Sequence, residues 1–109
     1  MNLLFVCSRN QWRSPTAERV WQNVPSIKVR SAGTSPRAKR TVSEADIRWA
    51  DQIFVMEYRH KKQISQRFSD LVQSCAIHVL DIPDDYGYMD AELVELLETR
   101  VHDILNEIA

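Results

Sequence analysis

Residues 3–18 read LLFVCSRNQWRSPTAE and begin with four apolar side chains in succession. An uninterrupted apolar run of this length is typical of a strand that is buried on both faces of a parallel sheet. Ser14 and Pro15 then fit the N-cap and first position of a helix, because proline needs no amide hydrogen there. The stretch therefore predicts a strand ending at Cys7, a short loop, and a helix extending to about Gln22.

Further runs of strand type follow at 27–32, 52–56 and 76–80. Helix-type stretches separate them, and we expect these helices over 44–49 with Ser43 as cap, over 57–72, and after the cap Asp90. This alternation predicts an α/β fold, namely a four-stranded parallel sheet with helices on both faces. Ligands of such sheets bind beyond the carboxyl ends of the strands, where Cys7 and Asp84 fall.

The composition indicates one soluble globular domain spanning residues 1–109, with 44% hydrophobic and 27% charged residues. The formal net charge of −1 favours neither nucleic-acid nor membrane-surface binding. The first apolar run is too short for a signal sequence or a membrane span, so we expect a cytoplasmic protein. The two cysteines suggest neither a disulfide framework nor a zinc site, and we expect no cofactor or metal. We interpret the scattered His60, His78 and His102 as structural or surface residues.

The loop after the first strand has the composition of an anion site. A sharp turn between a strand and a helix directs backbone amides into one concavity at the positive end of the helix. This environment favours the nucleophilic thiolate of Cys7. The guanidinium of Arg13 can hold two oxygens of a tetrahedral oxyanion, and Ser14 can donate its hydroxyl to the sulfur. Such a loop suits attack on phosphorus without a metal.

The same residues closely resemble the N-terminal signature of the low-molecular-weight protein tyrosine phosphatases. The resemblance rests on Cys7-x5-Arg13-Ser14 within the longer string of residues 3–18, and it continues at Ser31-Ala32-Gly33-Thr34 and at DQIFVM, residues 51–56. It covers most of the chain. Family members are usually longer, and the missing residues fall between Thr34 and Ser43, where the family has a loop beside the substrate pocket.

The resemblance implies that Cys7 is the nucleophile, that Arg13 binds phosphate and stabilises the transition state, and that Ser14 tunes the thiolate. Asn10 is expected to hold a left-handed turn and to bond with Ser31. The implied phosphate loop lies between the first strand and the first helix and consists of Ser8, Arg9, Asn10, Gln11, Trp12, Arg13 and Ser14. Inorganic phosphate or sulfate is expected to bind there.

The general acid is less well defined by the sequence. The family uses an aspartate in an Asp-Pro pair before the last helix, and this pair is absent from DIPDDYGYM, residues 81–89. Counting back from Asp90 favours Asp84, with Asp85 and Asp81 as alternatives. Tyr86 and Tyr88 are candidates for the wall of the pocket.

Three loop residues depart from the family pattern. Arg9 replaces the usual glycine, Trp12 replaces a second cysteine that can protect the nucleophile, and Gln11 occupies a specificity position that is apolar in tyrosine-directed members. We therefore predict a cysteine-dependent phosphomonoesterase of phosphotyrosine-type aryl phosphates, acting on a phosphorylated protein or a small aryl phosphate. The polar Gln11 keeps phosphoarginine open as the substrate.

Three alternatives to this function remain. An arsenate reductase of the same fold needs further cysteines, and Cys75 is the only other one. A degenerate module that binds phosphate without turnover is favoured by Arg9, Trp12 and the shortened loop, whereas the retained Cys7 and Arg13 favour an enzyme. The basic stretch 57–67 is a weaker candidate for an RNA-binding face, because no aromatic platform lies beside it.

Overall fold

The first apolar run forms strand β1 (Asn2–Cys7), in which the side chains of Leu3 to Val6 are fully buried. Alternate residues of this strand enter different cores: Leu3 and Phe5 pack in one hydrophobic cluster, and Leu4 and Val6 pack in the other. Both faces of the strand are therefore covered, as its uninterrupted apolar pattern predicts. These observations come from a computed structural model that describes residues 1–108.

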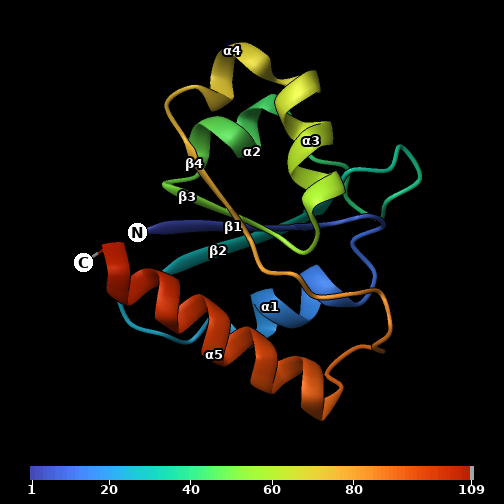
Figure 1. Ribbon diagram of the computed structural model, residues 1–109, viewed down its shortest axis with the longest axis vertical. Helices are drawn as coiled ribbons and strands as arrows, with labels where there is room; N and C mark the ends of the chain where they lie inside the picture. The colour runs from blue at the N-terminus through green and yellow to red at the C-terminus, as the bar shows by residue number, and fades with distance from the viewer. Residues whose placement is uncertain (109) are drawn as a thin grey trace.

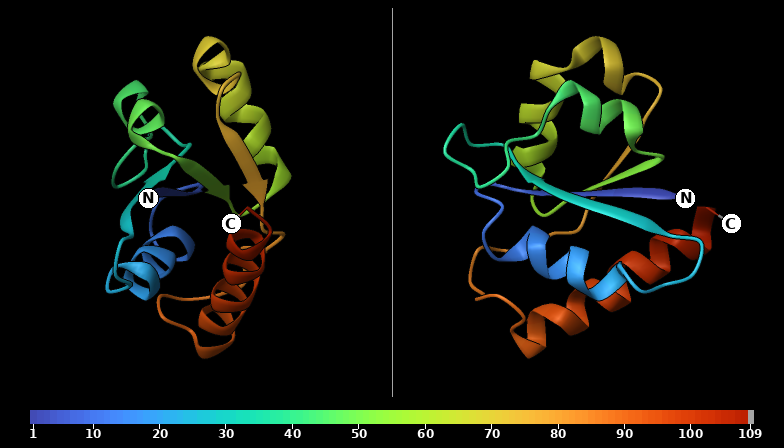
Figure 2. Two further views of the ribbon diagram at one scale, coloured as in Figure 1. Left: turned by 90° about the vertical axis from the view of Figure 1, so that its left-hand side faces the viewer. Right: turned by 180° about the vertical axis from the view of Figure 1, so that it is seen from behind.

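The four strands form one parallel sheet with the order β2-β1-β3-β4, where the other three strands are β2 (Lys28–Gly33), β3 (Gln52–Val55) and β4 (Ala76–Val79). Figures 1 and 2 show two helices below the sheet, α1 (Arg13–Trp21) and α5 (Ala91–Ile108). Three helices lie on the opposite face: α2 (Glu44–Trp49), α3 (Tyr58–Arg67) and α4 (Ser69–Val72). The predicted α/β fold, with helices on both faces of a four-stranded parallel sheet, is confirmed.

Two of the predicted helix caps are confirmed. The Ser43 hydroxyl accepts a hydrogen bond from the Asp46 N–H, and the Asp46 carboxylate accepts one from the Ser43 N–H, which completes a capping box. At the start of α5, Asp90 Oδ1 accepts the N–H groups of Glu92 at 2.9 Å and Leu93 at 3.4 Å.

The predicted cap of α1 is wrong. The helix begins at Arg13 with Trp12 as its N-cap, so Ser14 lies inside the first turn and caps nothing. The Ser14 hydroxyl instead lies 3.0 Å from Cys7 Sγ. A serine next to a proline has the composition of a cap, but here its hydroxyl is used by the loop that precedes the helix.

The predicted single helix over 57–72 is also wrong, because the structure divides it into α3 and α4. Phe68 breaks it with φ −124° and ψ 41°, although its N–H still closes the last turn of α3 on the Ile64 carbonyl. Ile64, Phe68 and Leu71 nevertheless pack against the same core cluster. The apolar spacing thus continues through the break, which explains why it predicted one helix.

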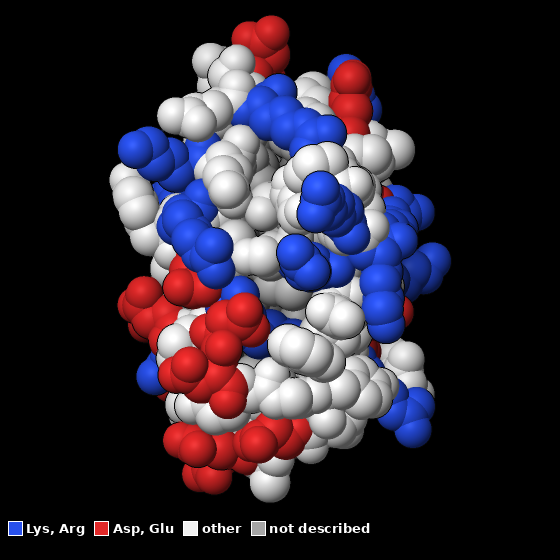
Figure 3. Space-filling model, turned by 90° about the vertical axis from the view of Figure 1, so that its right-hand side faces the viewer, with Lys and Arg blue, Asp and Glu red and all other residues white. Residues whose placement is uncertain are grey.

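The carboxyl ends of the strands meet at the edge of the sheet that faces the viewer in Figure 3. Lysine and arginine side chains cover much of the upper half and right side of this face, and acidic side chains gather at its lower left. A charged ligand that approaches this edge therefore meets a strongly divided surface. None of the helices in residues 1–108 has the length and apolar character needed to span a membrane.

Candidate active site

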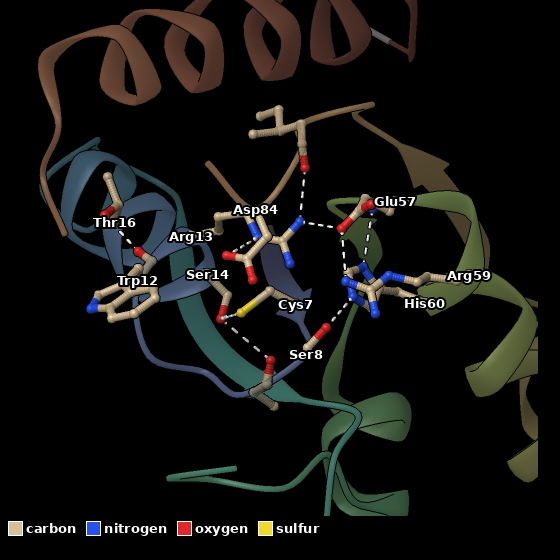
Figure 4. Close-up of polar contacts among 12 residues, drawn as sticks. Cys7, Ser8, Trp12, Arg13, Ser14, Thr16, Glu57, Arg59, His60 and Asp84 are labelled. Carbon is tan, nitrogen blue, oxygen red and sulfur yellow. Dashed lines mark hydrogen bonds and ion pairs between the residues drawn. The ribbon is translucent and has the colours of Figure 1, made fainter. Parts of the chain in front are cut away.

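A small cavity of about 40 Å³ lies directly after strand β1 at the carboxyl edge of the sheet. This cavity, which we term the cradle, is lined by Cys7, Ser8, Arg9, Gln11, Trp12, Arg13 and Asp84. Six of these residues come from the end of β1, the loop that follows it and the first residue of α1, and Asp84 comes from the loop before α5 (Figure 4). The structure thus brings the predicted nucleophile, the predicted arginine and one of the candidate acids to one place.

A chain of hydrogen bonds fixes the base of the cradle. Cys7 Sγ lies 3.0 Å from Ser14 Oγ, and Asn10 Nδ2 donates both to Ser14 Oγ at 3.0 Å and to Ser31 Oγ at 2.9 Å. Ser31 in turn donates to Glu18 Oε1 at 2.5 Å. Asn10 has the expected left-handed backbone, with φ 54°. Because Ser14 Oγ accepts from Asn10, its single proton can be donated to the sulfur of Cys7 at 3.0 Å or to the Ala32 carbonyl at 3.3 Å.

The loop that follows β2 supports the cradle from behind. The N–H of Thr34 donates to the Cys7 carbonyl, and the N–H of Ser35 donates to the Ser8 carbonyl, both at 2.9 Å. Gly33 is required at this contact, because a Cβ there would lie 2.6 Å from the Ser8 carbonyl oxygen and 2.6 Å from the Ala38 Cβ. The SAGT segment therefore serves as a close support for the phosphate loop.

Arg13 is only 2% exposed, and the protein holds one of its terminal nitrogens firmly. Nη1 donates to Glu57 Oε1 at 2.5 Å and to the Ile82 carbonyl at 2.8 Å. Within residues 1–108, the Nε and Nη2 groups donate no hydrogen bond, although Nε lies 3.6 Å from Asp84 Oδ1. This edge of the guanidinium presents the two parallel N–H groups that bind two oxygens of a phosphate.

His60 supports the cradle on the side of Ser8. Its ring is fully buried, and the backbone N–H of Glu57 donates to Nδ1 at 3.1 Å. Because that N–H can only donate, Nδ1 is unprotonated, and Nε2 carries the proton and donates to Ser8 Oγ at 2.9 Å. Burial and the charges of Arg13 and Arg59 together lower the pKa of His60 to about 4. The Ser8 hydroxyl thus keeps its own proton for another acceptor.

The three candidate acids lie in different environments. The side chains of all three are exposed, but Asp84 lines the cradle, whereas Asp85 and Asp81 do not. The backbone of Asp81 is in the left-handed region with φ 54°, and its carbonyl accepts from Arg100 at 2.7 Å. Among the three, the structure therefore places only Asp84 beside Cys7 and Arg13.

No family model and no curated protein matches this sequence. Solved structures do match over nearly the whole chain. The YwlE arginine phosphatase from Geobacillus stearothermophilus has 25% identity and a TM-score of 0.75, with 97% of this chain and 93% of that chain covered. The tyrosine phosphatase Wzb from Escherichia coli K30, in complex with phosphate, has 23% identity and a TM-score of 0.77, with 99% and 98% covered. SP-PTP, the low molecular weight protein tyrosine phosphatase from Streptococcus pyogenes, has 21% identity and a TM-score of 0.78, with 99% and 93% covered.

The chain therefore has the fold of the low-molecular-weight protein tyrosine phosphatases. In this chain the second cysteine is far from the cradle. Cys75 precedes β4, at the amino edge of the sheet, and packs against the core cluster on the α2 and α3 face. Cys7 ends β1 at the carboxyl edge and packs in the opposite cluster. The two thiols cannot form a disulfide without a large rearrangement of the sheet.

Sequence reasoning missed two residues of this phosphatase-fold site, Glu57 and His60. Burial raises the pKa of Glu57, but hydrogen bonds from Arg13 and Arg59 and their charges outweigh it, so its pKa is lowered overall. Glu57 follows β3 at the same sheet edge as Cys7. Its position beyond the end of a predicted strand was the sequence feature that could have identified it as a site residue. The histidine was interpreted as structural or surface; the structure shows it fully buried and bonded to the phosphate loop.

Proposed function

We propose that this protein is a phosphomonoesterase that hydrolyses phosphotyrosine-type aryl phosphates through a cysteinyl-phosphate intermediate. The observation that carries the proposal is the placement of Cys7 Sγ, the free edge of Arg13 and the Asp84 carboxyl around one cavity of about 40 Å³. This volume suits a single tetrahedral anion. The similarity to phosphatase structures supports the same chemistry.

The proposed first step transfers the phosphoryl group to Cys7. The Cys7 thiolate attacks phosphorus while the bond to the aryl oxygen breaks, and Asp84 donates its proton to that leaving oxygen. Arg13 and the backbone amides of the loop stabilise the charge on the equatorial oxygens. The hydroxyl of Ser14, 3.0 Å from the sulfur, stabilises the thiolate before attack.

The second step releases phosphate. The Asp84 carboxylate accepts a proton from a water molecule, whose oxygen attacks phosphorus as the phosphorus–sulfur bond breaks. The electron pair of that bond returns to Cys7 as the thiolate, and the proton remains on Asp84. Cys7 and Asp84 thus return to their starting states, and neither proposed step uses a metal or cofactor.

Hydrolysis of an aryl phosphate by matched variants tests this mechanism. We expect Cys7→Ser to abolish turnover and Asp84→Asn to lower kcat by about 10²–10⁴-fold. Asp81→Asn and Asp85→Asn make the same change in the same loop and serve as controls, with kcat within about twofold of wild type. Turnover that survives Cys7→Ser would refute the covalent mechanism. Binding of vanadate by a wild-type protein that turns nothing over would instead identify a phosphate-binding module.

A phosphoarginine phosphatase is the second candidate function. Gln11 lines the cradle and offers a polar side chain to the group that carries the phosphate. The similarity to the YwlE arginine phosphatase supports this alternative. Comparison of kcat/KM for phosphoarginine and an aryl phosphate distinguishes the two, and Gln11→Leu is expected to lower only the phosphoarginine value. The placement of Cys75 on the far edge of the sheet disfavours an arsenate reductase.

A further inference from the structure

A second cavity, of about 460 Å³, adjoins the cradle on the outer side of the phosphate loop. This cavity, which we term the groove, is lined by Asn10, Gln11, Trp12, Pro15, Ser31, Lys39 and Tyr88. Gln11 and Trp12 line both cavities, so these two side chains form the boundary between the groove and the cradle. A ligand with its phosphate in the cradle can extend over these two side chains into the groove.

Backbone hydrogen bonds hold the walls of the groove in place. Thr16 Oγ1 donates to the Trp12 carbonyl at 2.6 Å and accepts the N–H of Met89 at 2.9 Å, which fixes the loop carrying Tyr88 beside the phosphate loop. On the opposite wall, the N–H of Lys39 donates to the Arg9 carbonyl at 3.1 Å. The groove is thus already formed before a ligand arrives, which reduces the entropy cost of binding.

The groove has an apolar wall with unusually exposed side chains. Trp12 is 44% exposed, Tyr88 is 54% exposed and the neighbouring Met89 is 40% exposed. These three account for half of the six large hydrophobic side chains that are exposed within residues 1–108. Exposed aromatic side chains grouped in this way mark surfaces that bind an apolar partner group.

The lining of the groove includes one basic residue, Lys39, and the lining of the adjacent cradle includes the exposed Arg9. Within residues 1–108, neither side chain forms an ion pair, whereas Arg40 and Arg59 are paired with Asp46 and Glu57. Lysine and arginine side chains also cover much of the upper half and right side of the carboxyl edge shown in Figure 3. The unpaired ammonium of Lys39, in the groove itself, is complementary to a carboxylate.

We propose that the groove binds the residues that flank the phosphorylated side chain of an acidic polypeptide. An apolar side chain lies against Trp12 and Tyr88, and a neighbouring glutamate or aspartate pairs with Lys39. A polypeptide supplies the phosphate, the apolar group and the carboxylate on adjacent residues, whereas a small aryl phosphate fills the cradle alone. This inference rests on the proposed phosphatase function and names its substrate class.

Binding to the Cys7→Ser variant tests the groove separately from turnover. The probes are two fluorescent phosphotyrosine peptides that differ only in their flanking residues, Glu and Leu in one and Lys and Leu in the other. At low salt we expect fluorescence anisotropy to give a Kd about tenfold lower for the acidic peptide. Adding Lys39→Glu is expected to abolish or reverse this preference.

Two further variants complete the test. Lys28→Glu makes the same charge change at the amino edge of the sheet, where Lys28 also forms no ion pair with another of residues 1–108, and is expected to keep the preference. Tyr88→Ala is expected to lower the affinity for the acidic peptide several-fold. It is not expected to change the affinity for a matched peptide with Gly in place of Leu. Equal affinities of the acidic and basic peptides, or a preference that survives Lys39→Glu, would overturn the inference. Neither result bears on the proposed function, which is tested separately by the hydrolysis of an aryl phosphate by wild type and Cys7→Ser.

Discussion

Replacement of His60 by glutamine is expected to make the protein more resistant to acid. The folded pKa of His60 is about 4, whereas an unfolded histidine has a pKa near 6.5. Between these values the unfolded chain binds more protons than the folded chain, so stability falls as the pH falls. The folded pKa is depressed because the ring is buried beside Arg13 and Arg59, and because Nδ1 must stay unprotonated to accept the Glu57 N–H.

The size of this effect follows from the two pKa values. Between the two pKa values, each fall of one pH unit lowers the free energy of unfolding by about 1.4 kcal/mol. The loss attributable to His60 between pH 7 and pH 5 is therefore about 2 kcal/mol. A typical domain is stable by only about 5–15 kcal/mol, so the effect is measurable. Glutamine stays neutral over this range and can still exchange hydrogen bonds with Glu57 and Ser8.

Urea unfolding followed by far-UV circular dichroism at pH 7, 6 and 5 measures the effect. We expect the wild type to lose about 2 kcal/mol more than His60→Gln over this interval. His102→Gln changes an exposed histidine on α5 and serves as the control, with a pH dependence like that of wild type. The reasoning would be refuted if the free energy of unfolding depended on pH equally in wild type and His60→Gln. An NMR titration of His60 with a midpoint near pH 6.5 would also refute it.

Three further substitutions test the supports of the cradle. Gly33→Ala introduces a Cβ 2.6 Å from the Ser8 carbonyl oxygen, so urea unfolding should show a loss of about 1–3 kcal/mol and phosphate should protect the variant less than wild type. Asn10→Ala and Asn10→Gly both remove two hydrogen bonds, but φ 54° makes alanine about 1 kcal/mol worse, so glycine should unfold at the higher urea concentration. Glu57→Gln removes a partner of Arg13 and should destabilise the protein near neutral pH. Because the pKa of Glu57 is lowered on folding, the stability it adds is present above its usual pKa of 4.5 and is lost as the pH falls, so the gap from wild type should narrow toward pH 4.

The sequence predicted the architecture because the apolar run of each strand fitted only one type of element. The run from Leu3 to Val6 has no polar side to face water, and the side chains of Ser43 and Asp90 bond to the first turns of the helices that they cap. Ser14 was assigned wrongly as a cap because its partners, Cys7 and Asn10, lie in a loop whose shape the sequence does not specify. The role of Ser14 is therefore set by its tertiary contacts, although its local sequence is that of a helix cap.

The site was predictable only where the family signature is contiguous. The residues from Cys7 to Ser14 follow one another, whereas Glu57 and His60 reach the cradle from a different strand and helix. A carboxylate after a strand indicates only that it lies at the carboxyl edge of the sheet. Which arginine it contacts depends on strand order, and β3 lies next to β1 only in the assembled sheet.

Arg13 accounts for the position of the proposed acid, Asp84, without an Asp-Pro pair. Its Nη1 group is fixed by Glu57 and donates to the Ile82 carbonyl at 2.8 Å, so the start of the loop before α5 is held against the cradle. Ile82 is fully buried in the core, and Asp84 follows two residues later beside Arg13 Nε. In the proposed mechanism, the same guanidinium offers its Nε and Nη2 edge to the phosphate and uses Nη1 to hold the loop that carries Asp84, the proposed general acid. A lysine keeps the charge but has no second edge, so we expect Arg13→Lys to impair both phosphate binding and proton transfer.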